Sequence, residues 1–174
     1  MMNLLELFKP ITTLVFDVDG VLTDGRLTLL PGGVMARTMN VKDGYALQLA
    51  VKRGYKVVII SGGASVEVID RLNKLGIKDV YMQVTDKITV LQNFLAENNI
   101  SWQEVMYMGD DIPDLEVMEK AALACCPSDA VPEIKEVSAY ISPQAGGYGC
   151  GRDVIEKVLK IRGHWKEDTH IPSR

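Results

Sequence analysis

The sequence predicts an α/β fold in which helices cover both faces of a doubly wound, mostly parallel sheet. Short apolar runs rich in Val and Ile recur along the 174 residues, at 12–16, 56–60, 79–82, 105–108 and 123–125. They do not alternate with polar residues, which is typical of strands buried on both faces. Segments with helical spacing separate the runs. This rhythm indicates one Rossmann-like domain spanning residues 1–174.

The segments between the apolar runs carry helix signals. Apolar residues recur at helical spacing in 45–52, 66–75, 88–97, 112–121 and 154–161. Gly76 and Gly163 stand where two of these helices should stop. Ser101, followed three residues later by Glu104, is a capping-box pattern that predicts a short helical turn.

One segment interrupts the alternation of strand and helix. Residues 26–40 contain Pro31-Gly32-Gly33 between two apolar stretches, which predicts a β-hairpin with a glycine-rich tip. The hairpin follows the first strand directly, so we expect a flap over a site. The last residues, 164–174, are polar and are expected to form a loose tail.

Composition excludes several classes of protein. The net charge is −4, so no overall positive field favours nucleic acid or an anionic membrane. No apolar run approaches the roughly 20 residues of a membrane span, and the N-terminus lacks a signal-peptide pattern. The three cysteines form neither a disulfide framework nor a metal-binding pair. We expect a cytoplasmic protein with reduced cysteines.

Polar clusters follow four of the predicted strands. They comprise Asp17 and Asp19, then Ser61, Gly62 and Gly63, then Lys87, and finally Asp110, Asp111 and Asp114. Open α/β sheets bind ligands beyond the carboxyl ends of their strands. The clusters are therefore expected to form one site. An isolated Asp after a strand is often only a helix cap, so the convergence carries the prediction.

The residue types in these clusters suit phosphate chemistry. Asp17, Asp19 and Asp110 would repel one another unless a divalent cation neutralised them. Oxygen ligands without nearby His or Cys favour Mg²⁺ over Zn²⁺. The Ser61 hydroxyl and backbone N–H groups of Gly62 and Gly63, at an expected helix start, would cradle an anion.

These residues predict a phosphatase. Asp17 is the candidate nucleophile that forms an aspartyl-phosphate, and Asp19 is the candidate acid and base for the leaving group and for water. Ser61 and Lys87 would neutralise charge on the phosphoryl oxygens. Asp24, seven residues after Asp17, is expected only to close the loop.

The clusters resemble the motifs of the haloacid dehalogenase (HAD) superfamily. FDVDGVLTDG, residues 16–25, resembles its first motif. Ser61-Gly62, Lys87 and residues 109–114 resemble the second, third and fourth motifs, in the same order. The resemblance implies Mg²⁺ bound by Asp17, the carbonyl of Asp19 and Asp110. Asp111 and Asp114 would support the metal waters and Lys87.

The hairpin is the only insertion after the first motif, so the sequence leaves no room for the cap domain of larger members. The absence of a cap domain narrows the resemblance to 3-deoxy-D-manno-octulosonate (KDO) 8-phosphate phosphatases. NVKDGY, residues 40–45, resembles a segment of that family, as do Gly146-Gly147-Tyr148-Gly149 and Arg152. The resemblance implies hydrolysis of KDO 8-phosphate in lipopolysaccharide precursor synthesis. It also implies a homotetramer in which neighbouring subunits cover the site. The implied substrate contacts are Asp19, Asn40, Val41, Lys42, Asp43, Gly44, Gln48, Gly62, Gly63, Arg71 and Lys87.

Three residues differ from the family pattern and leave alternatives open. Lys42, Gly63 and Tyr148 each stand where the family often has Arg, a fork-shaped donor for carboxylate or phosphate. A nine-carbon, sialic-acid-type 9-phosphate is therefore the alternative substrate. A receiver-like signalling domain also carries clustered Asp and Lys, but it lacks an acid two residues after the acceptor. A catalytically inactive HAD protein is disfavoured because every catalytic residue type is present.

Overall fold

A six-stranded parallel sheet forms the centre of the molecule. The computed structural model describes residues 4–172. The strands lie in the order β5-β4-β1-β6-β7-β8, and every neighbouring pair is parallel. Their bounds are β1 (Thr13–Phe16), β4 (Lys56–Ile60), β5 (Asp79–Tyr81), β6 (Val105–Met108), β7 (Leu123–Cys126) and β8 (Tyr140–Ile141). β1 is buried along its whole length and lies third in this order. Its carboxyl end therefore lies near the middle of the sheet edge.

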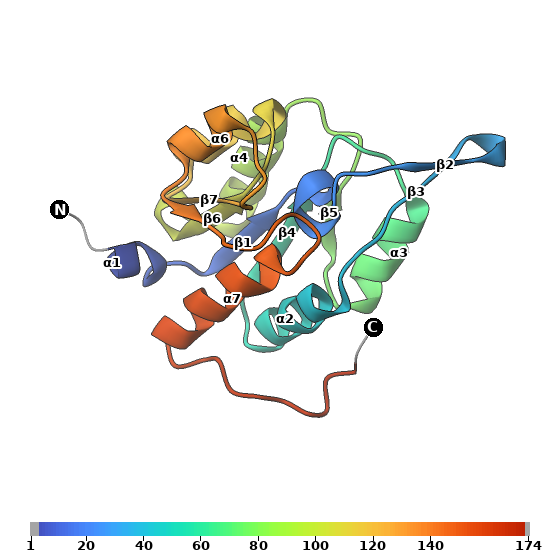
Figure 1. The fold of residues 1–174 in the computed structure, drawn as a ribbon. Helices are drawn as coiled ribbons and strands as arrows, with labels where there is room; N and C mark the ends of the chain where they lie inside the picture. Colours follow the sequence, from blue (N-terminus) through green and yellow to red (C-terminus); the bar gives the residue numbers. More distant parts are fainter. Residues whose placement is uncertain (1–3, 173–174) are drawn as a thin grey trace.

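Helices cover both faces of the sheet (Figure 1). One face packs against α1 (Leu4–Phe8), α2 (Val41–Lys52), α3 (Val66–Lys74) and α7 (Cys150–Ile161), and the other against α4 (Lys87–Asn98), α5 (Leu115–Lys120) and α6 (Pro132–Val137). Successive residues of β1 serve the two cores, because side chains alternate across a strand. Leu14 and Phe16 face α2 and α7, whereas Val15 faces α4.

The predicted fold class is confirmed, with differences at element ends. α2 begins at Val41, four residues before the predicted start, because Asn40 caps it by accepting the Lys42 N–H at 2.8 Å. The capping box at Ser101 is present. The stop at Gly76 is also present, with φ of 87°. The sequence prediction missed α1, α6 and β8, which are each six residues or shorter.

The predicted hairpin is present and projects beyond the sheet (Figure 1). Its strands β2 (Thr28–Leu30) and β3 (Val34–Ala36) pair antiparallel around a turn at Pro31–Gly33. Its apolar side chains are largely uncovered: Leu29 is 76% exposed, and Val34 and Met35 are each 46% exposed.

The segment after residue 164, expected to be loose, instead lies along α2. Arg53 donates to the carbonyls of His164 and Lys166. Lys52 forms an ion pair with Asp168, whose backbone N–H also donates to the Tyr45 hydroxyl. Composition alone did not indicate these contacts, because the partners are more than 100 residues away in sequence. Residues 173–174 lie outside the described part.

Two expectations from composition can be compared with the structure. Within residues 4–172, no helix is both long enough and apolar enough to cross a membrane. Cys125, Cys126 and Cys150 are free and buried, and their reduced state stays a prediction.

Candidate active site

The turn after β1 presents the first carboxylates. Asp17 directly follows the last residue of the strand and is 7% exposed. The chain then makes a tight helical turn, Val18–Leu22, in which Gly20 has φ of 87°. A Cβ at Gly20 would lie 1.9 Å from Asp110 Oδ2, so only glycine allows the turn to pack against that carboxylate. Asp24 Oδ1 accepts the Arg26 N–H at 3.0 Å, which confirms its predicted role in closing the loop.

The predicted clusters meet in one cavity of about 540 Å³ at the carboxyl edge of the sheet. This confirms the convergence on which the sequence prediction depended. The cavity is lined by Asp17, Asp19, Ser61, Gly62, Gly63, Lys87, Asp110, Asp111 and Asp114, together with Gly25, Val84, Thr85 and Pro113.

Three carboxylates form the floor of this cavity. Asp17, Asp110 and Asp114 each offer an oxygen, and these oxygens lie within 4.8 Å of one another. Burial and the charge of Asp114 raise the pKa of Asp17 to about 7. Burial and the charge of Asp17 raise the pKa of Asp110 to about 8. Asp110 Oδ1 is also buried without a hydrogen bond. An oxygen-only set with an unpaired buried oxygen fits a hard divalent cation such as Mg²⁺.

Lys87 balances part of this negative charge. It is the first residue of α4, is 6% exposed, and places Nζ 3.1 Å from Asp17 Oδ1 and 2.7 Å from Asp114 Oδ1. Burial alone would lower the pKa of Lys87, but the charges of Asp17 and Asp114 outweigh it and raise the pKa. Lys87 is therefore a fixed cation beside the candidate nucleophile, as the sequence predicted.

Tyr107 is a site residue that the sequence analysis missed. Its hydroxyl donates to Asp114 Oδ1 at 2.8 Å from inside β6. The backbone N–H of Asp110 donates to the other oxygen of Asp114 at 3.2 Å. Asp114 therefore orients Lys87, while the exposed Asp111 caps the turn at Ile112–Asp114 by accepting the Ile112 N–H. A tyrosine within an apolar strand gives no sequence signal of such a role.

The raised carboxylate pKa values predict how pH acts on stability and metal binding. An unfolded Asp titrates near pH 4, whereas Asp17 and Asp110 titrate at about 7 and 8. Between these values the folded protein holds more protons than the unfolded chain, so stability in EDTA should fall as pH rises from about 4 to about 8. A cation must displace these protons, so Mg²⁺ should raise the melting temperature more at pH 8 than at pH 5.

Thermal unfolding in EDTA and in excess MgCl₂ at both pH values measures this effect. Asp110→Asn should remove most of the dependence on Mg²⁺. An equal Mg²⁺ shift at the two pH values would contradict the assignment of these carboxylates to the cation.

Ser61 and the two glycines after it line the same cavity as Asp110. Ser61 is 1% exposed, and its hydroxyl accepts the Gly63 N–H at 3.1 Å. The prediction that Gly62 and Gly63 open a helix is wrong. α3 begins at Val66, and Ser65 caps it by accepting the Val68 N–H. The Gly62–Gly63 bend, and not a helix N-terminus, therefore faces the cavity.

Arg37 is a second residue that the sequence analysis missed. It follows β3, and its guanidinium donates to both carboxylate oxygens of Asp19. Nε lies 2.7 Å from Oδ1 and Nη2 lies 3.0 Å from Oδ2. The side chain of Arg37 is 4% exposed. The hairpin is thereby tied to the candidate acid, and no motif in the sequence indicated this contact.

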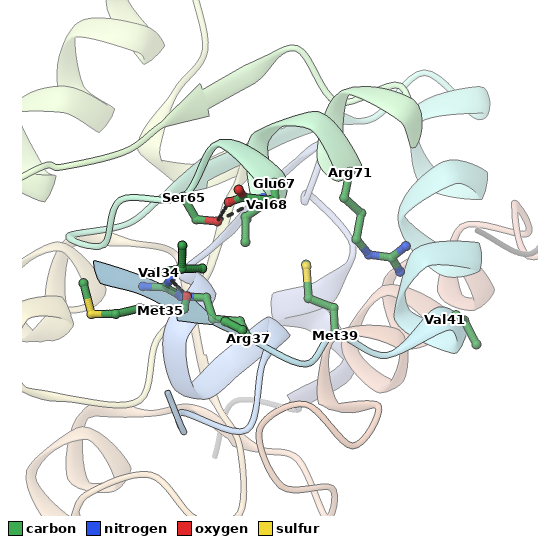
Figure 2. Close-up of a pocket in the computed structure, with 10 residues that line it drawn as sticks. Val34, Met35, Arg37, Met39, Val41, Ser65, Glu67, Val68 and Arg71 are labelled. Atoms are coloured by element: carbon green, nitrogen blue, oxygen red, sulfur yellow. Dashed lines mark hydrogen bonds between the residues drawn. The ribbon is translucent and has the colours of Figure 1, made fainter. Parts of the chain in front are cut away.

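Arg37 also lines a groove of about 430 Å³ to which Asp19 does not contribute (Figure 2). It runs between β3 and α3, and Arg37, Met39, Val41, Val68 and Arg71 contribute to its lining. Arg37 and Arg71 lie toward opposite ends of the groove in this view. Two predicted substrate residues, Val41 and Arg71, therefore lie together here.

The other predicted substrate residues on α2 line neither cavity. Asn40 donates to the carbonyl of Gly147 at 3.2 Å, and Lys42 is exposed. Gly44 is buried in α2, and Gln48 donates to the carbonyl of Pro172 in the C-terminal segment at 3.0 Å. The structure joins Asn40 and Gln48 to the C-terminal half of the chain, and contact of all four residues with substrate stays a prediction.

Asp43 has a structural role that is visible in the fold. It is 2% exposed, and its Oδ1 accepts the backbone N–H of Arg152 at 2.7 Å near the start of α7. Burial raises the pKa of Asp43 to about 6. The contact joins α2 to the glycine-rich segment Gly146–Gly149, which lies directly before α7.

Comparison with known proteins decides the family. Residues 77–149 match the haloacid dehalogenase-like hydrolases. The KDO 8-phosphate phosphatase of Escherichia coli strain K12 is 35% identical over 91% of this chain and 85% of its own length. The chain belongs to the KDO 8-phosphate phosphatase family of the HAD-like hydrolases. It is therefore an enzyme of the phosphoric monoester hydrolase class.

Solved structures share the fold of this phosphatase. The KDO 8-phosphate phosphatase of Yersinia pestis superposes with a TM-score of 0.90 at 30% identity, covering 92% of this chain and 87% of the other. The Moraxella catarrhalis enzyme, solved with magnesium, phosphate and KDO, gives a TM-score of 0.89 at 32% identity. It covers 92% of this chain and 93% of its own.

Proposed function

We propose that this phosphatase hydrolyses KDO 8-phosphate to KDO and phosphate, with Mg²⁺ and through an aspartyl-phosphate at Asp17. The observation that carries the proposal is the buried Asp17 carboxylate beside the Lys87 ammonium, in the cavity at the carboxyl end of β1. Its relatives are named for this substrate, and one of them binds magnesium, phosphate and KDO. The reaction would serve lipopolysaccharide precursor synthesis.

In the first step, an Asp17 oxygen attacks phosphorus in line with the leaving sugar oxygen. The new bond between Asp17 and phosphorus forms as the bond between phosphorus and the C8 oxygen breaks, and Asp19 gives its proton to the departing alkoxide. Lys87 neutralises charge on the phosphoryl oxygens, and the Ser61 hydroxyl donates to one of them. The products are KDO and the acyl phosphate on Asp17.

In the second step, Asp19 accepts a proton from a water molecule that attacks phosphorus. The acyl phosphate bond breaks, phosphate leaves, and the Asp17 carboxylate and protonated Asp19 are restored. Asp19 serves both steps because it is two residues beyond the nucleophile and lines the same cavity. A receiver-like domain lacks an acid at this position.

The donor set fits a magnesium ion. Asp17, Asp110 and the backbone carbonyl of Asp19 would hold it, with Asp111 and Asp114 supporting its waters and Lys87. When bound, the cation offsets the charge of the carboxylates and of the phosphate, and it draws the two together. The clustered carboxylate oxygens and the unpaired Asp110 Oδ1 support this assignment.

The two candidate substrates differ in the number of carbon atoms in the sugar acid. The NVKDGY segment and the relatives favour the eight-carbon KDO 8-phosphate over the nine-carbon, sialic-acid-type 9-phosphate. We expect kcat/KM to be at least tenfold higher for KDO 8-phosphate, which corresponds to about 1.4 kcal/mol. Initial rates with both compounds, measured by phosphate release with Mg²⁺, test the proposal. A preference for the 9-phosphate would overturn it.

The homotetramer and the cytoplasmic location stay predictions from the resemblance. The uncovered Leu29, Val34 and Met35 of the hairpin support an apolar contact with another subunit. Such a contact would cover the cavity that a cap domain covers in larger relatives.

A further inference from the structure

The Arg37–Asp19 pair conflicts with the role of Asp19 in the reaction. Both carboxylate oxygens of Asp19 accept N–H donors from one guanidinium, at 2.7 and 3.0 Å. Asp19 needs one oxygen in contact with the leaving sugar oxygen, and later with water. Arg37 must therefore withdraw from at least one oxygen before Asp19 can act.

The structure has made room for this arginine. A Cβ on Gly63 would lie 2.9 Å from Arg37 Nη2 and 2.8 Å from Asp19 Oδ2. A side chain at Gly63 and the present position of Arg37 are therefore incompatible. Arg37, which follows the hairpin, thus brings a guanidinium next to Gly63, a position that has no side chain of its own.

The groove that Arg37 lines offers its guanidinium a second place to bind a carboxylate. Arg37 links two cavities, because its partner Asp19 lines the carboxylate cavity and Arg37 itself lines the groove together with Arg71 (Figure 2). The third guanidinium nitrogen, Nη1, donates to the carbonyl of Met35 at 3.0 Å, which keeps the guanidinium beside β3. The bidentate geometry that holds Asp19 is the geometry that binds any planar carboxylate.

We propose that Arg37 is a specificity-determining residue that exchanges Asp19 for the carboxylate of the substrate. In the free enzyme the guanidinium holds Asp19 as a carboxylate. In the complex it binds the sugar-acid carboxylate in the groove and releases Asp19, which takes up a proton from solvent and then acts as the acid. This inference rests on the proposed function, because it requires a substrate that carries both phosphate and carboxylate. KDO 8-phosphate and the nine-carbon alternative both satisfy it.

The test compares two substrates in three enzymes. KDO 8-phosphate carries the carboxylate, and ribose 5-phosphate is a primary alkyl phosphate without one. Arg37→Ala should lower kcat/KM for KDO 8-phosphate about 100-fold, the effect of losing a charged hydrogen-bonded pair. The same variant should raise kcat/KM for ribose 5-phosphate, because Asp19 is no longer held. Arg26→Ala, which removes an exposed charge at the base of the hairpin, should leave the ratio of the two values unchanged.

Arg37→Lys gives a second measurement if the alanine variant folds poorly. It keeps the charge but loses the fork, so its substrate ratio should lie between those of wild type and Arg37→Ala. An equal fall on both substrates, or no change on either, would overturn the inference while leaving the phosphatase proposal intact. A wild-type enzyme that hydrolyses ribose 5-phosphate but neither sugar-acid phosphate would overturn both.

Discussion

Asp17→Asn should reduce turnover of KDO 8-phosphate by at least about 10⁴-fold, because the amide cannot form the aspartyl-phosphate on which both steps depend. The variant keeps the size and shape of the side chain. It also removes a negative charge from a crowded, buried cluster. We therefore expect a folded protein whose melting temperature in EDTA equals or exceeds that of wild type.

Steady-state phosphate release and thermal unfolding measure the two parts of this prediction. Asp70→Asn is the matched control, since Asp70 is exposed on α3 and does not line the carboxylate cavity. It should retain wild-type turnover. Turnover of Asp17→Asn within tenfold of wild type would mean that another group attacks phosphorus.

Lys87→Ala should impair both activity and stability. Nζ is buried between Asp17 and Asp114, so its removal leaves carboxylates facing one another without a cation. Breaking a buried ion pair costs about 3–5 kcal/mol of folding free energy. Turnover should fall by about 10³-fold, because the phosphoryl oxygens lose a fixed positive charge.

Magnesium separates the two effects of Lys87→Ala. Excess MgCl₂ should restore much of the lost stability, measured by denaturant unfolding, because the cation offsets the same carboxylates. It should not restore turnover. Lys78→Ala, at an exposed lysine just before β5, is the control and should change neither quantity. A mild effect of Lys87→Ala on turnover would contradict a catalytic role and would mean that Lys87 only stabilises the buried carboxylates.

Much of the site was predictable because parallel sheets gather the ends of their strands. Asp17, Ser61 and Asp110 each follow an apolar run, so their meeting followed from the fold class alone. Lys87 was predictable for a different reason: a lysine is unfavourable at a helix N-terminus unless an anion is near. The structure supplies that anion in Asp17 and Asp114.

The contacts that escaped prediction depend on side-chain direction between distant elements. Arg37 follows a hairpin strand with no period that distinguishes inward from outward residues, so its grip on Asp19 appears only in three dimensions. Tyr107 looks like any core aromatic until its hydroxyl is seen to meet Asp114. The C-terminal segment reads as polar and loose, yet Arg53 and Lys52 bind it to α2.

Trapping the covalent intermediate tests the role of Asp17 as nucleophile most directly. Wild-type enzyme mixed with Mg²⁺ and KDO 8-phosphate is quenched in acid within one turnover, digested, and analysed by mass spectrometry. We expect the peptide that contains Asp17 to gain the mass of one phosphoryl group, which hydroxylamine removes, and we expect no such gain in Asp17→Asn. Rapid phosphate release with no phosphorylated peptide, or with the phosphoryl group on another residue, would contradict this role of Asp17.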